Sequence, residues 1–140
     1  MNERFVFPFT VGEELMDYVD RSSLLQKDTY LLLQGKKEKD CYLFDQLQEP
    51  GDLDMLQLQI RQAASDPEKI SLVIATTVLP HSEEQAQSYF RRLLAQYPIF
   101  LGGTIDYDMF HLYRYSSDQN DLLPITNFEF QAKESMMTSI

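Results

Sequence analysis

The segment that most constrains the fold runs from Lys69 to Phe90 (KISLVIATTVLPHSEEQAQSYF), where an apolar, β-branched run leads through a short turn into a helix. The composition of SLVIATTVLP, residues 71–80, is typical of a buried strand. The following segment, SEEQAQSYFRRLLAQYP, places Ala86, Leu93 and Leu94 on one side of a helix that stops at Pro98. The chain therefore contains a strand-to-helix junction, the kind of place where many enzymes hold metal ligands or a nucleophile.

The rest of the chain alternates between the same two patterns. Short aromatic or β-branched runs predict strands, and apolar residues three or four positions apart predict helices. The polar run KKEKD has the length of a hairpin connection, and the glycine pair in LGGT reads as a bulge or kink in a strand. We expect strands within 3–9, 28–35, 40–50, 71–80, 99–106, 109–116 and 122–130, and helices at about 11–24, 51–67 and 82–98.

This order of elements predicts the α/β (α+β) class, with a single mixed, largely antiparallel sheet flanked by about three helices. A length of 140 residues fits one domain, and a chain of this size buries roughly two thirds of its unfolded surface. We expect one domain over 1–130. The last ten residues, 131–140 (QAKESMMTSI), lack any period and predict a flexible C-terminal tail.

The charge balance excludes several classes of partner. The sequence has 22 acidic and 12 basic residues and a formal net charge of −10, which repels phosphate backbones and anionic lipids, so we expect neither nucleic acid nor membrane as a partner. The single cysteine, Cys41, cannot form an internal disulfide and is expected to be a small buried hydrophobe. With no signal peptide evident, these features favour a cytoplasmic location.

Two local stretches, DTYLLLQG and LVIATTVLPHSEEQ, together with the order of elements over about 5–130, resemble the JAB/MPN-domain family. In active members of that family, two histidines and an aspartate hold a zinc ion with water in the fourth position, and a glutamate acts as general base on that water. The resemblance implies a JAB/MPN-like fold for this chain.

The positions that match the family's functional residues lack its chemistry. Asp28 stands in place of the glutamate, Thr77 and Leu79 in place of the histidines, and Ser82-x-x-Gln85 in place of Ser-x-x-Asp. Thr77, Leu79 and Gln85 supply neither imidazole nor carboxylate, so all three metal ligands of the zinc site are missing. The resemblance therefore implies a degenerate member with no catalytic residues, no metal and no cofactor.

Each of these residues also has a local interpretation. Ser82 with Gln85 forms a capping box at the start of a helix, and acidic pairs such as Asp52 and Asp54 suit a helix N-terminus. His81 is expected to be exposed, and His111 to lie on one face of a strand.

The predicted function is a non-catalytic protein-binding or scaffold module that contacts a protein partner or a second copy of itself. Tyr113 and Tyr115 share one side of a strand and are the candidate interface residues. Two alternatives remain open. One is a small hydrolase that uses Asp28, His81 or His111 at an unrecognised site, and the other is an acidic inhibitory or immunity-type protein.

Overall fold

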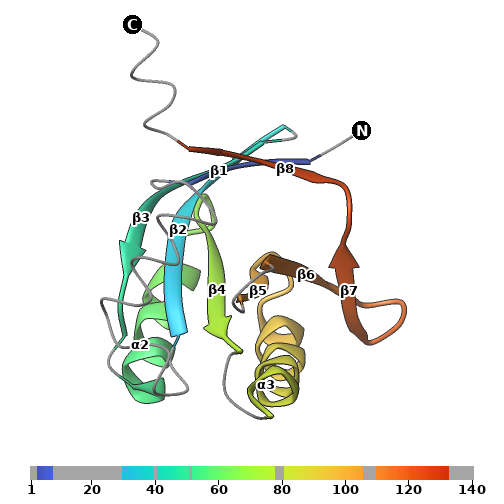
Figure 1. Ribbon diagram of the computed structural model, residues 1–140. Coiled ribbons are helices and arrows are strands. Elements are labelled where there is room, and N and C mark those ends of the chain that lie inside the picture. Colours follow the sequence, from blue (N-terminus) through green and yellow to red (C-terminus); the bar gives the residue numbers. More distant parts are fainter. Residues whose placement is uncertain are drawn as a thin grey trace, which may run out of the picture.

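The computed structural model describes residues 3–7, 30–39, 41–50, 52–77, 81–105 and 110–132, with backbone only over 130–132. Within these ranges no helix has the length and apolar content needed to cross a membrane. In chain order the described elements are β1 (Glu3–Phe7), β2 (Tyr30–Glu38), β3 (Cys41–Gln48), α2 (Leu53–Ala64), β4 (Ile70–Thr76), α3 (Ser82–Gln96), β5 (Leu101–Ile105), β6 (Phe110–Ser116), β7 (Asp121–Ile125) and β8 (Phe128–Ala132) (Figure 1).

All eight strands belong to one curved sheet with the order β7-β6-β5-β4-β2-β3-β1-β8, which nearly closes into a barrel. The two strands at opposite ends of this order, β7 and β8, are consecutive in the chain and separated only by residues 126 and 127. The amide of Glu3 on β1 donates to the carbonyl oxygen of Asn127 in that link, at 3.0 Å. The chain itself thus connects the two edges of the sheet.

Strands β1 and β6 are not neighbours in the sheet, yet their side chains meet across its inner face. Arg114 on β6 pairs with Glu3 on β1, and the rings of Phe7 and Phe110 lie 6.1 Å apart between centroids. Because β5, β4, β2 and β3 lie between β6 and β1 in the sheet order, these contacts require the sheet to curl until the two strands face each other. Its inner face is filled by a buried apolar cluster from seven strands: Phe5, Phe7, Leu31, Leu33, Tyr42, Phe44, Ile70, Leu72, Ile74, Leu101, Ile105, Leu112 and Ile125.

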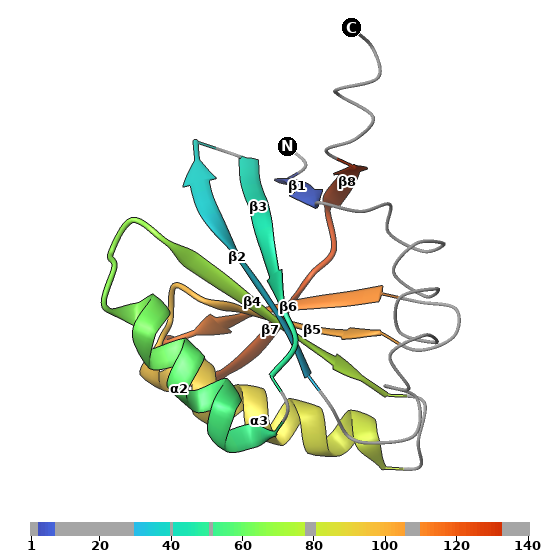
Figure 2. The same ribbon diagram turned by 90° about the vertical axis from the view of Figure 1, so that its left-hand side faces the viewer.

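Both described helices cover the outer face of the sheet and lie side by side there (Figure 2). Because β4 and β5 are parallel, α3 must return the chain across the sheet between them. On this side the core combines Leu32, Val73 and Ala75 of the sheet with the inward faces of α2 (Leu56, Ile60, Ala63) and α3 (Ala86, Tyr89, Phe90, Leu93, Leu94).

The predicted fold is wrong in its architecture. Instead of a JAB/MPN-like sheet flanked by about three helices, the sheet curls into a nearly closed barrel, and the two helices within the described ranges lie on the same face. The expected helix at 11–24 lies outside the described residues. The expected strand at 122–130 is two strands, β7 and β8, because the chain passes from one sheet edge to the other at 126–127.

The glycine pair in LGGT does not form a bulge, since Gly102 and Gly103 keep continuous register with β4 and β6. A Cβ on Gly102 would lie 2.9 Å from the ring of Phe90, so the glycine lets α3 approach the sheet. The irregularity in register falls instead between Gln34 and Gly35, where β2 pairs with β3. There, Gly35 packs against the backbone of Leu43.

Candidate functional site

The strand-to-helix junction, which the sequence singled out, is occupied by structural contacts. The amide and hydroxyl of Thr77 both donate to the carbonyl oxygen of Ile105, at 2.9 and 3.3 Å, and so extend the pairing of β4 with β5. Ser82 is buried and Gln85 is exposed. Leu79 and Asp28 lie outside the described residues. In the ranges that the structure describes, no group of three or more His, Cys, Asp or Glu side chains could hold a metal ion.

The start of α3 differs from the capping box predicted for Ser82. His81 occupies the N-cap position with a left-handed backbone (φ 65°), and its carbonyl oxygen accepts the amide of Gln85 at 3.2 Å. Ser82 is the first residue of the helix, so the prediction that it caps α3 is wrong by one position. The junction turns through a left-handed histidine, a conformation that helix-start patterns do not reveal.

The other candidate residues are dispersed over the sheet. His81 is exposed before α3, whereas His111 is half-buried on β6 opposite Thr104. Neither histidine forms an ion pair with a described carboxylate. Cys41 is half-buried at the start of β3, rather than fully buried as expected. The structure therefore brings none of these residues together.

Tyr113 and Tyr115, the predicted interface residues, lie on the helix side of the sheet and are half-buried. The Tyr113 hydroxyl accepts a hydrogen bond from Nε2 of Gln87 on α3 at 3.4 Å, and the Tyr115 hydroxyl donates to Oδ1 of Asn120. Because α3 covers part of both rings, their role at an interface stays a prediction.

A groove of about 450 Å³ between α2 and α3 has the features of a binding site. The α2 wall presents Leu53, Gln57, Ile60 and Arg61, and the α3 side presents Tyr89, Arg92, Leu93, Gln96 and the adjoining Tyr97. Ile60 and Leu93 are buried at its base, whereas Leu53 keeps 47% of its surface exposed. Among the described residues that line the groove, the two charged side chains, Arg61 and Arg92, are basic and exposed.

One polar group in the groove is unsatisfied. The Tyr89 hydroxyl is buried and has no hydrogen-bond partner among the described residues, although its ring packs against Tyr30 with centroids 5.2 Å apart. Burial, reinforced by Tyr30, raises the pKa of Tyr89 to about 12. The hydroxyl therefore stays protonated at neutral pH.

Comparison with family models and with curated proteins finds no match to this chain. The resemblance to the JAB/MPN family, which rested on two stretches and on the order of elements, gains no support from these comparisons. The groove was not predicted from the sequence because it forms between two helices that are distant in the chain. The signal that could have indicated it is a basic residue beside the apolar stripe of each helix: Arg61 follows Ile60, and Arg92 precedes Leu93.

Proposed function

We propose that this protein is a non-catalytic protein-binding module whose α2–α3 groove receives an acidic segment of a partner, anchored by an apolar side chain. One observation carries this proposal. The chain has a net charge of −10, yet the groove has an arginine on each wall and no acidic side chain among its described lining residues. A local reversal of charge of this kind favours an anionic segment over a basic one.

The remaining chemistry of the groove fits the same occupant. An apolar side chain would rest against Ile60 and Leu93 at the base, and the exposed Leu53 would be covered. Binding of an apolar-anchored segment between two helices is a common mode of peptide recognition.

The exposed face of α2 extends the apolar surface beyond the groove. Met55 and Leu58, three residues apart on the helix, have 44% and 47% of their surface exposed. Adjacent exposed apolar side chains are typical of surfaces that contact other proteins. We infer that the partner covers part of this face as well as the groove.

The proposal is tested with two synthetic 15-residue amphipathic peptides of identical leucine spacing, one with glutamate and the other with lysine at every polar position. Fluorescence anisotropy should show saturable binding of the acidic peptide, at least tenfold tighter than that of the basic one. Arg92→Gln should weaken the acidic peptide's binding severalfold. Arg91→Gln is the matched control, since Arg91 is the adjacent residue and pairs instead with Asp121 at 2.8 Å.

Two results would overturn the proposal. Equal binding of both peptides would show that charge has no part in recognition, and equal loss in the two arginine variants would show that the groove is not the site. A second copy of the chain is the other possible occupant. Sedimentation velocity tests it: a wild-type dimer that Arg92→Gln converts to a monomer would assign the groove to self-association instead.

A further inference from the structure

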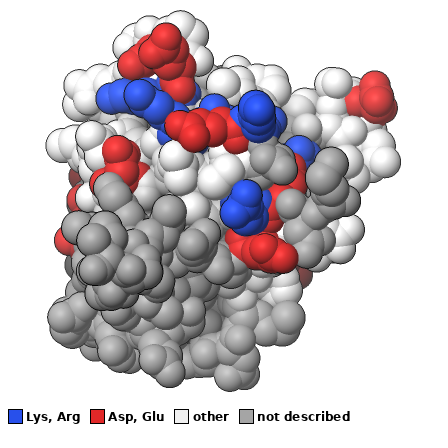
Figure 3. Space-filling view, turned by 90° about the horizontal axis from the view of Figure 1, so that it is seen from above, with Lys and Arg blue, Asp and Glu red and all other residues white. Residues whose placement is uncertain are grey.

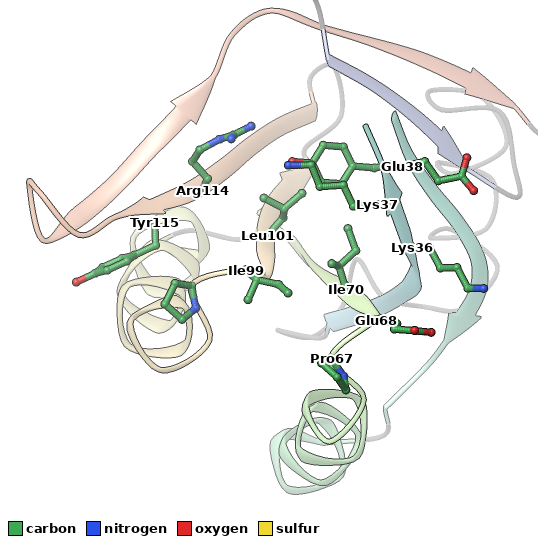
Figure 4. A pocket seen from close by; sticks show the side chains of 12 residues that line it. Lys36, Lys37, Glu38, Pro67, Glu68, Ile70, Ile99, Leu101, Arg114 and Tyr115 are labelled. Atoms are coloured by element: carbon green, nitrogen blue, oxygen red, sulfur yellow. The ribbon is translucent and has the colours of Figure 1, made fainter. Parts of the chain in front are cut away.

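A second cavity, of about 600 Å³, lies at the end of the barrel where β4 and β5 begin (Figure 4). Its buried apolar lining consists of Ile70 and Leu101, each less than 5% exposed, together with the ring of Tyr42. The volume falls within the range of roughly 300–1,000 Å³ in which small-molecule sites occur, and barrel mouths are a recurrent place for such sites.

The register of β2 decides which charges face this cavity. Lys37 stands directly opposite Tyr42 on β3, so both side chains project from the inner face of the sheet. Lys36 and Glu38 alternate with Lys37 and project from the outer face. Figure 4 shows Lys37 and Arg114 extending toward each other above Leu101, whereas Lys36 and Glu38 point away.

Among the described residues, the two inward cations outnumber the inward carboxylates at this end of the barrel. Glu3, on the same face as Phe5, accepts one hydrogen bond from Nη2 of Arg114, which leaves other donors of the guanidinium free to bind a second group. The Lys37 ammonium lies 5.3 Å from the centre of the Tyr42 ring, and no described carboxylate pairs with it. This cluster therefore has one unbalanced positive charge beside an apolar floor.

The positive charge is confined to the cavity and does not continue as a basic patch on the surface seen in Figure 3. On the face seen in Figure 3, lysine and arginine side chains lie directly beside aspartate and glutamate side chains. The rim of the cavity itself carries Glu38 and Glu68. Such a mixed surface disfavours a large polyanion and favours a small ligand with a single anionic group.

We propose that the barrel-end cavity binds a small amphipathic organic anion. Its apolar body rests on Ile70 and Leu101, and its anionic group, a carboxylate or another oxyanion, lies between Lys37 and Arg114. The described residues that line this cavity and those that line the α2–α3 groove do not overlap, so this inference goes beyond the proposed protein-binding function and does not depend on it.

The probe is 8-anilinonaphthalene-1-sulfonate, an amphipathic anion whose fluorescence rises in apolar sites. We expect saturable one-site binding that octanoate displaces at least tenfold more effectively than octan-1-ol, because only octanoate carries a charge. Inorganic phosphate serves as a further competitor: displacement at low millimolar concentration would assign recognition to the oxyanion alone and overturn the requirement for an apolar body.

Matched lysine variants locate the site. Lys37→Met should raise the dissociation constant of the probe at least tenfold, whereas Lys36→Met, one residue away on the outer face, should change it less than twofold. Lys37→Arg keeps the charge and should stay within about threefold of wild type. Circular dichroism verifies folding of each variant, and the octanoate and octan-1-ol comparison on the wild type needs no variant.

Any of the following results would overturn the inference: equal effects of Lys36→Met and Lys37→Met, equal displacement by octanoate and octan-1-ol, or absence of saturable binding. Loss of probe binding in Arg92→Gln, with Lys37→Met unaffected, would also overturn it by placing the probe in the α2–α3 groove. Failure of the acidic peptide to bind that groove leaves these measurements unchanged, so the two proposals fail separately.

Discussion

Arg114 on β6 and Glu3 on β1 form an ion pair across 111 positions of sequence, although their strands are not neighbours in the sheet. The two side chains are 37% and 28% exposed, so solvent only partly screens their attraction. The pair therefore helps to hold the curled sheet closed at the end where the barrel-end cavity opens.

We expect Glu3→Gln to lower the free energy of unfolding by about 1 kcal/mol, the upper part of the range for partly exposed pairs. A double-mutant cycle with Arg114→Met, measured by urea unfolding, isolates the coupling between the two side chains. The Arg91–Asp121 pair is the control, because its side chains are 48% and 51% exposed and should couple less. A larger coupling in the control would contradict the role assigned to Glu3 and Arg114.

Gly35→Ala should be the most damaging glycine substitution among Gly35, Gly102 and Gly103. A Cβ at Gly35 would lie 1.8 Å from the backbone oxygen of Leu43, which cannot move without shifting β3, so we expect a loss of more than about 3 kcal/mol or failure to fold. At Gly103 the nearest atom is 3.2 Å away, so Gly103→Ala should be milder. Thermal unfolding of both variants tests the order, which a milder Gly35→Ala would refute.

The stability of the protein should fall as the pH rises from about 10 to about 12. The pKa of Tyr89 is about 12 in the folded state against 10.0 in the unfolded chain, so the unfolded state releases this proton first. Between these values the unfolded state binds fewer protons, and stability declines by about 1 kcal/mol per pH unit. Below pH 10 Tyr89 is protonated in both states, so it does not make the stability depend on pH.

Tyr89→Phe should remove this part of the pH dependence, as measured by urea unfolding of both proteins from pH 8 to pH 11.5. At pH 7 the variant should be as stable as the wild type or slightly more so, because it removes a buried hydroxyl that lacks a partner. Identical slopes in the two proteins above pH 10 would show that another group is responsible.

Asp52→Ala should destabilise α2 by about 1 kcal/mol, because the Asp52 carboxylate accepts the amide of Met55 at 2.8 Å as an N-cap. Asp54→Ala is the control, since Asp54 lies in the first turn but does not occupy the N-cap position. It should lose only the weaker interaction with the helix dipole. Chemical denaturation of the two variants gives the comparison, and equal losses would argue against the capping role.

Much of the local structure could be predicted from periodicity. The run of three leucines at 31–33 and the spacing of Leu56 and Ile60 depend on residues near in sequence, and the corresponding strand and helix form as expected. The closure of the sheet could not be predicted in this way. It depends on which distant strands pair. In LLPITNFEF the one residue that indicates the passage from β7 to β8 is Pro124, which suits a strand at an edge.

The candidate sites were less accessible to sequence reasoning than the strands. Leu53 continues the apolar spacing of Leu56 and Ile60, but nearly half of it is exposed because α3 leaves a groove beside it. Likewise Lys37 and Arg114 are far apart in sequence, and only the register of β2 and the curl of the sheet turn both toward one cavity. Such sites arise from tertiary geometry, which residue spacing alone does not encode.

The position of β1 between β3 and β8 imposes an order on folding. Phe5 pairs with Tyr42 on one side and with Phe130 on the other, so its second neighbour comes from the far end of the described chain. Pairings this distant in sequence form slowly because they require a large loop to close. Until β8 docks, β1 is an exposed edge strand at which a second molecule can add its own β8 in place of the missing one, so refolding at low protein concentration should give the higher yield of monomer.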